Sequence, residues 1–275
     1  MSSDRPRIEI ENDRVYARLD GRRDAGPEPR ALHYDVYFGA GDAAAKPGLL
    51  LVHGGGWRRG SRDAMRGYGI RLAQAGTTCV AIEYRLTPES PWPAQIHDVK
   101  RALRFVRAHA AELGIDPDRI ALQGSSAGAH LALLAAGTPG DPTLAPDAEA
   151  RAVEERVSAV VAVYPPTLFY AGGERPSGAL AAQALMGRAA TPELARQASP
   201  LAYVSKEFPP TLLLHGTADR IVPPSASLRM YEALSEAGVP AGLHLFAEQP
   251  HGFARQPSHQ PLLAATIALF LDQYV

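Results

Sequence analysis

The chain is poor in cysteine: Cys79 is the only one among its 275 residues. A single cysteine cannot form a disulfide within the chain. Cys79 lies inside the apolar run 77–82, where a thiol buried in a strand is expected rather than a reactive one.

Long hydrophobic runs and an excess of one charge are also missing. No apolar run approaches the length that crosses a membrane, and no apolar stretch follows the charged segment 1–7. The 28 basic and 29 acidic residues give a formal net charge of -1, and the basic residues are scattered. A nucleic acid or an anionic membrane needs a contiguous positive field, so we expect neither as a partner. We expect a soluble, cytoplasmic protein without an export signal.

Apolar residues, in contrast, make up 46% of the chain, which is enough for a sizeable core. α/β folds of this length often close as one unit, so we expect a single domain over residues 1–275.

Short apolar runs alternate with longer segments of helical period. This alternation is typical of an α/β fold with a mostly parallel central sheet and helices on both faces. The expected strands are 32–38, 48–52, 77–84, 119–123, 157–163, 211–214 and 243–246, and the expected helices are 63–75, 94–113, 127–136, 225–237 and 260–274.

Two stretches fit this alternation poorly. Residues 138–156 are rich in Pro, Asp and Glu, and residues 165–200 contain Gly172, Gly173 and an alanine-rich middle. Both are long for simple connections, so we expect them to form a small cap or the walls of a pocket. A surface loop is the alternative.

Residues 124–128 read Gly-Ser-Ser-Ala-Gly between a predicted strand and a predicted helix. This G-x-S-x-G pattern is typical of a nucleophile elbow, a strained turn that exposes a serine hydroxyl at the edge of the sheet. The flanking glycines let neighbouring chains approach the turn closely. Ser126 is therefore the candidate nucleophile.

A serine hydroxyl needs a base to take its proton and an acid to orient that base. Asp219 follows the strand 211–214 and His251 follows the strand 243–246, so both are expected at the same sheet edge as Ser126. We predict a catalytic set of Ser126, Asp219 and His251. The other histidines and acids are expected in packing, turn or surface positions, and they include His33, His97, His109, His130, His215, His244, His259, Asp98, Asp116, Asp118 and Asp141.

Attack on a carbonyl creates an oxyanion, which backbone N–H groups can stabilise. Gly55 and Gly56 lie on a glycine loop after the strand 48–52, and Ala127 follows the nucleophile at a helix N-terminus. We predict these three residues as the oxyanion hole. Trp57, directly after the glycines, is a candidate for substrate binding, with core packing as the alternative.

Cofactor and metal motifs are not found. The chain has no H-E-x-x-H, no cysteine pair, no G-x-G-x-x-G opening a helix and no Walker loop. We expect no cofactor and no metal, which this chemistry does not need.

These motifs together resemble the α/β-hydrolase superfamily. Within it, they are similar to the hormone-sensitive-lipase-like esterases and to the acetyl xylan or feruloyl esterase-like (BD-FAE-type) carboxylesterases. The resemblance spans residues 49–253 and also rests on Tyr-Arg-Leu-Thr-Pro-Glu at 84–89 and His-Gly-Thr-Ala-Asp at 215–219. Ser125 and Ala129 stand where the hormone-sensitive-lipase-like esterases usually have Asp and Gly, and the long N-terminal helical cap of that group is missing. Both features favour the compact, small-capped esterases, a group that is also similar to kynurenine formamidases.

The resemblance implies a serine carboxylesterase that forms an acyl-enzyme on Ser126, with acetyl or feruloyl esters of sugars as candidate substrates. The short chain and the small expected cap favour short-chain carboxylic esters over long lipids. The partner of this enzyme would be a small-molecule ester. An arylformamidase or amidase with the same triad is the alternative, and a non-catalytic hydrolase-like binding protein is a third reading. A homodimer, paired through helix 260–274 or the edge strand near Leu243, is left open.

Overall fold

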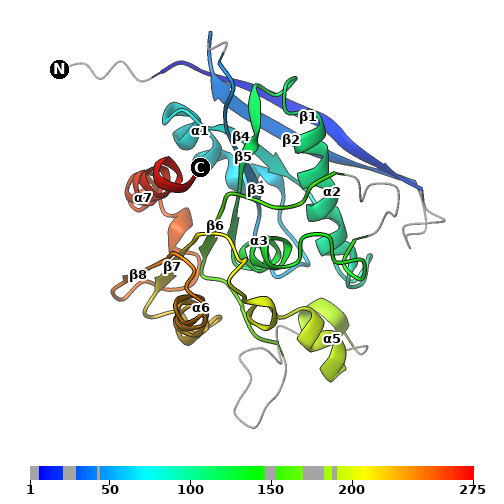
Figure 1. Ribbon diagram of the computed structural model, residues 1–275, viewed down its shortest axis with the longest axis vertical. Coiled ribbons are helices and arrows are strands. Elements are labelled where there is room, and N and C mark those ends of the chain that lie inside the picture. The colour runs from blue at the N-terminus through cyan, green and yellow to red at the C-terminus, as the bar shows by residue number, and fades with distance from the viewer. Residues whose placement is uncertain (1–5, 21–28, 42–43, 146–152, 170–182, 188–190) are drawn as a thin grey trace.

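The computed structural model describes residues 6–20, 29–41, 44–145, 153–169, 183–187 and 191–275. Its centre is an eight-stranded sheet in the order β1-β2-β4-β3-β5-β6-β7-β8 (Figure 1). The pairs from β4 to β8 are all parallel, and β2 runs antiparallel to both β1 and β4. The strands are β1 Ile8–Leu19, β2 Arg30–Gly39, β3 Lys46–Val52, β4 Thr78–Ile82, β5 Ile115–Ser125, β6 Ala159–Val163, β7 Thr211–Gly216 and β8 Ala241–Phe246.

Helices cover both faces of the sheet, because side chains along each strand alternate between two apolar layers. Leu49 and Leu51 pack with α1 and α7, whereas Leu50 and Val52 pack with α2, α3 and α6. In the described part of the chain, the helices include α1 Arg66–Gln74, α2 Ala94–Ala108, α3 Ala127–Gly137, α5 Pro192–Gln197, α6 Ser225–Glu236 and α7 Gln260–Tyr274, with short 3-10 turns at η1 Arg62–Met65, η4 Pro200–Tyr203 and η5 Phe253–Arg255. The predicted fold class, a mostly parallel sheet covered by helices on both faces, is confirmed.

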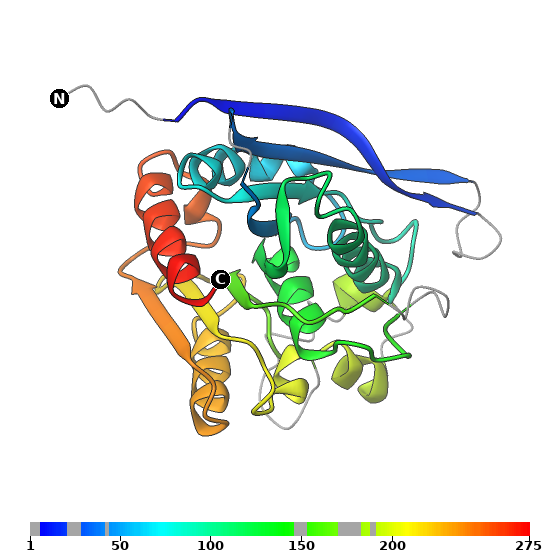
Figure 2. The ribbon, with the colours of Figure 1, turned by 45° about the horizontal axis from the view of Figure 1, so that its top comes forward.

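The N-terminal strand β1 was not expected. Figure 2 shows β1 and β2 as a long antiparallel ribbon along one edge of the molecule. Most side chains of β1 are exposed or half-buried, so its sequence lacks the apolar alternation that marks a strand with one buried face. A second difference concerns the helix predicted to reach Leu113. It ends at Ala108, and the chain then turns at Gly114, whose φ is 63°.

The two long stretches are described only in part, since residues 146–152, 170–182 and 188–190 lie outside the described residues. The first is anchored to α2, because Lys100 Nζ lies 3.0 Å from Glu155 Oε2 and Arg104 pairs with the other carboxylate oxygen. All three side chains are buried. The second contains α5 and ends at Pro200, the first residue of η4. A cap formed by these stretches, and the single domain, stay predictions.

In the described part of the chain, no helix is both long and apolar enough to cross a bilayer.

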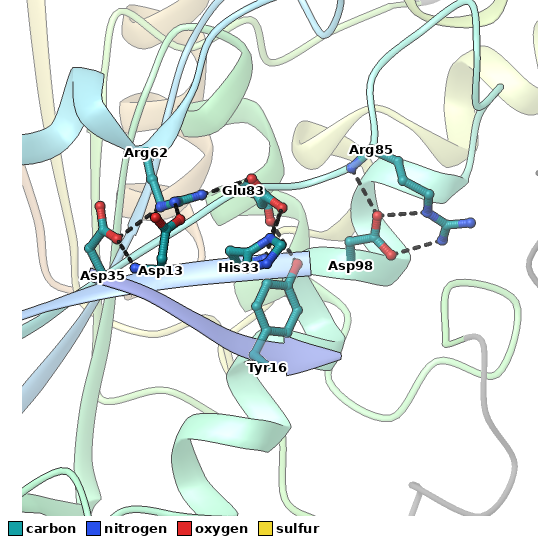
Figure 3. Close-up of polar contacts among 8 residues, drawn as sticks. All are labelled: Asp13, Tyr16, His33, Asp35, Arg62, Glu83, Arg85 and Asp98. Carbon is teal, nitrogen blue, oxygen red and sulfur yellow. Dashed lines mark hydrogen bonds and ion pairs between the residues drawn. The ribbon is translucent and has the colours of Figure 1, made fainter. Parts of the chain in front are cut away.

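Arg62 connects the N-terminal ribbon to the rest of the fold (Figure 3). Its Nε donates to Asp35 Oδ1 at 2.8 Å, its Nη1 donates to Glu83 Oε2 at 2.9 Å, and its Nη2 pairs with Asp13. These carboxylates come from β2, from the residue after β4, and from β1. One guanidinium therefore holds three neighbouring strands beside η1.

Replacement of Arg62 by alanine is expected to destabilise the protein by about 3 kcal/mol, because the buried Asp35 carboxylate would lose its charged partner. The measurement is urea unfolding at neutral pH. Arg14→Ala is the control, since the Arg14–Glu11 pair is exposed by 48% and 46% and should contribute less than about 1 kcal/mol. Equal losses in the two variants would contradict this role of Arg62.

Candidate active site

The turn at Ser126 joins β5 to α3 and has a strained backbone. Ser126 has φ 54° and ψ -117°, a conformation that residues other than glycine rarely adopt. The glycines on either side are required by close packing. A Cβ on Gly124 would lie 2.2 Å from the carbonyl oxygen of Gly128, and one on Gly128 would lie 2.1 Å from that of Val52. The expected elbow geometry is present.

The three predicted catalytic residues are hydrogen-bonded in series. Ser126 Oγ lies 2.9 Å from His251 Nε2, and His251 Nδ1 lies 2.6 Å from Asp219 Oδ2. With the hydrogen on Nδ1 donated to the carboxylate, Nε2 is left to accept from the serine hydroxyl. Asp219 follows β7 and His251 follows β8, and both therefore reach the same sheet edge as the elbow.

Asp219 is held as a carboxylate by its neighbours. Burial opposes its ionised form, but hydrogen bonds from His215 and His251 and the backbone N–H of Val222 outweigh burial and hold the pKa well below its usual range. Asp219 Oδ1 accepts from the N–H groups of Ile221 and Val222, at 2.9 Å each. The negative charge that faces His251 is thus maintained at neutral pH.

His215 contacts the acid directly, which the sequence reasoning did not foresee. The sequence places it only at the end of the strand before Asp219, yet its Nε2 lies 3.3 Å from Asp219 Oδ2 and 2.9 Å from the carbonyl oxygen of Val222. His215 Nδ1 lies 2.7 Å from Ser227 Oγ. The available signal was its place in the His-Gly-Thr-Ala-Asp motif, four residues before Asp219.

Tyr164 is a second neighbour that the sequence did not reveal. It follows β6 with a positive φ of 44°, and its ring centroid lies 4.6 Å from that of His251. Burial raises the pKa of Tyr164 to about 12, although neighbouring Ser125 acts in the opposite direction. One side of the His251 ring is thereby packed against a buried aromatic ring.

The glycine loop packs directly on the elbow. A Cβ on Gly54 would meet the carbonyl oxygen of Ser125 at 2.6 Å and Ser126 Cβ at 3.3 Å. Gly55 and Gly56 have positive φ values of 129° and 61°. Ala127 is the first residue of α3, where a backbone N–H has no acceptor within the helix. Gly54 and Ala127 therefore lie directly beside Ser126, and Gly55 and Gly56 follow Gly54 along the chain. The role of Gly55, Gly56 and Ala127 as oxyanion donors stays a prediction.

Trp57 lies in a buried aromatic cluster beside this loop. Its Nε1–H donates to His130 Nδ1 at 3.1 Å, and its ring contacts those of His130 and Phe169. Its residue is only 3% exposed, which shows a packing role. Contact with substrate stays a prediction. His130 Nε2 donates to the carbonyl oxygen of Ala198 at 2.7 Å, so the cluster connects the glycine loop, α3 and the end of α5.

The competing acids and histidines have other partners. Asp98 is buried in an ion pair with Arg85, at 2.8 Å, and His33 contacts Glu83 (Figure 3). Within the described part of the chain, no three His, Cys, Asp or Glu side chains are grouped so as to hold a metal ion.

The chain is similar to known esterases along most of its length. The BD-FAE family profile matches residues 34–234. Esterase LipQ of Mycobacterium tuberculosis is 38% identical over 80% of this chain and 52% of LipQ, and the probable carboxylic ester hydrolase LipM of the same organism is 38% identical over 76% of this chain and 50% of LipM. The chain thus spans about half the length of these two relatives.

A solved structure covers nearly the whole chain. Esterase 2 of Thermogutta terrifontis, phosphonylated by cyclosarin, has a TM-score of 0.79 and 27% identity over 98% of this chain and 95% of that one. The sheet order and the elbow define an α/β-hydrolase, and the proteins that the chain matches are named as esterases. Within that class, the chain belongs to the BD-FAE family.

Stability is expected to depend on pH through His130. Burial lowers its pKa from 6.5 to about 4 in the fold. Between pH 6.5 and 4, His130 binds a proton in the unfolded chain but not in the fold. The contribution of neutral, buried His130 to stability is therefore complete above pH 6.5 and is lost progressively as the pH falls to 4. At about 1.4 kcal/mol per unit of pKa difference, the free energy of unfolding falls by about 3 kcal/mol.

The measurement is the free energy of unfolding in urea from pH 7.5 to 4. His130→Gln keeps a donor for Ala198 but cannot titrate, so its stability should fall less steeply over this range. His244→Gln, at an exposed position of β8, is the control and should keep the wild-type slope. A wild-type slope in His130→Gln would refute the assignment.

Proposed function

We propose that the protein is a serine carboxylesterase that hydrolyses short-chain carboxylic esters through an acyl-enzyme on Ser126. The observation that carries the proposal is the hydrogen-bonded series from Ser126 through His251 to Asp219 at the strained elbow. The esterase names of its relatives support the same reaction class.

The first half of the reaction forms the acyl-enzyme. Ser126 Oγ attacks the ester carbonyl carbon while His251 Nε2 takes the hydroxyl proton, and the carbonyl electrons move onto its oxygen. The N–H groups of Gly55, Gly56 and Ala127 would stabilise this oxyanion, each by about 3 kcal/mol. When the tetrahedral intermediate collapses, the bond to the alcohol oxygen breaks, and His251 Nε2 returns its proton to the leaving alcohol.

The second half repeats these steps with water. His251 Nε2 takes a proton from a water that attacks the acyl carbon, and the same N–H groups hold the second oxyanion. Collapse breaks the bond to Ser126 Oγ, which recovers a proton from His251, and the carboxylic acid leaves. Asp219 keeps His251 oriented and stabilises its protonated form without itself taking the proton.

Short acyl groups are proposed as substrates. Structures of the Thermogutta terrifontis esterase, 26% identical to this chain, have propionate or butyrate bound. The same esterase is phosphonylated by cyclosarin, which supports the use of phosphonate reagents as probes of Ser126.

Replacement of Ser126 by alanine should abolish covalent labelling by a fluorophosphonate and lower p-nitrophenyl butyrate turnover by at least about a thousandfold, because the nucleophile is lost. Intact-mass spectrometry and initial rates measure the two effects. The neighbouring Ser125→Ala is the matched control and should still be labelled. Labelling that persists in Ser126→Ala would refute Ser126 as the nucleophile.

The acyl-chain preference is tested with p-nitrophenyl esters from acetyl to palmitoyl. We expect kcat/KM to be highest among acetyl, propionyl and butyryl and to fall for longer chains. A steady rise toward palmitoyl would contradict the proposed substrate class. Acetylated sugars, feruloyl esters and N-formylkynurenine complete the panel, and faster turnover of N-formylkynurenine than of phenyl acetate would favour an arylformamidase.

A further inference from the structure

His215 occupies an unusual place behind the proposed catalytic acid. It is fully buried at the end of β7, and its ring nitrogens face three polar groups. Nε2 lies 2.9 Å from the Val222 carbonyl oxygen and 3.3 Å from Asp219 Oδ2, and both of these atoms are acceptors. Nε2 therefore carries a hydrogen that is shared between them.

Ser227 fixes the other side of this ring. Its hydroxyl, also fully buried, lies 2.7 Å from His215 Nδ1 and comes from α6. A contact on each nitrogen prevents the ring from rotating. The imidazole is thus locked between α6 and the loop that carries Asp219.

The carboxylate of Asp219 is consequently held from two sides. The backbone N–H groups of Ile221 and Val222 hold Oδ1, and both His215 and His251 contact Oδ2. Val222 is used twice, since its N–H binds the carboxylate and its carbonyl oxygen accepts from His215. Any rotation of the carboxylate would break contacts in both sets.

We propose that His215, braced by Ser227, is a positioning residue that aims Asp219 at His251. This inference rests on the proposed function. It goes further by assigning a role to a buried pair that touches no substrate.

The test compares His215→Leu, His215→Gln and Ser227→Ala. Active sites are titrated with a fluorophosphonate, and kcat and KM for p-nitrophenyl butyrate are expressed per titrated site. Leucine removes both contacts, so kcat should fall by up to about a hundredfold with KM little changed. Glutamine can place an amide N–H near the Nε2 position and should recover part of the loss, and Ser227→Ala should give a smaller loss in the same direction.

Thr211→Val is the matched control. Thr211 is a fully buried polar residue at the first position of the same strand, whereas His215 lies near its other end. The Thr211 hydroxyl bonds to the Pro209 carbonyl oxygen. The control should lower the melting temperature while leaving kcat per site unchanged. A purely structural role for His215 predicts the same behaviour, so a wild-type kcat per site in His215→Leu overturns the proposal. If His215→Leu does not fold, a wild-type kcat per site in both His215→Gln and Ser227→Ala overturns the proposal.

A proton NMR measurement separates this inference from the proposed activity. The short contact between His251 Nδ1 and Asp219 should give a low-field N–H resonance that is absent in His251→Gln. The resonance should shift and broaden in His215→Leu and Ser227→Ala but not in Thr211→Val, whether or not any ester is hydrolysed. Failure of the wild type to label would overturn the esterase assignment, whereas an unchanged resonance in both variants would overturn the role of His215.

Discussion

Close backbone packing around Ser126 is the constraint from which the site is built. The residue has φ 54°, which costs on the order of 1 kcal/mol or more and persists only where the surroundings hold it. Its N–H donates to the Val163 carbonyl oxygen at 2.8 Å. Gly128 packs against the carbonyl oxygen of Val52, so one contact holds the elbow against β3, and β3 runs directly into the glycine loop. Nucleophile and oxyanion loop are thereby fixed together.

Buried charges in this fold are held by specific partners. Asp219 is satisfied by two backbone N–H groups and two histidines, which is why it can remain ionised while buried. Elsewhere, Asp98 pairs with Arg85 and the three-carboxylate contact of Arg62 binds the N-terminal ribbon. Removing one member of such a group costs stability even where the net contribution of the intact group is small, because a buried charge loses a partner.

Local patterns predicted the fold class and the placement of Ser126, Asp219 and His251 at one sheet edge. The strand β1 escaped prediction because its side chains are mostly exposed, and an edge ribbon of this kind carries little apolar periodicity. The helix predicted as far as Leu113 was wrong in its last residues, since the apolar spacing continues through the turn that precedes β5. The spacing of apolar residues shows which side chains are buried, and a buried turn can have the same spacing as a helix.

The sequence by itself determines the order of strands and helices and the glycines that the elbow requires, because hydrophobic periodicity and steric room depend on residues that are close together in the chain. They could not show that His215 contacts Asp219, that Tyr164 packs on His251 or that Trp57 is buried. These contacts depend on how α6, β6 and the glycine loop come together in three dimensions. The lowered pKa values of His130 and Asp219 have the same origin, since desolvation and hydrogen-bond partners exist only once the chain has folded.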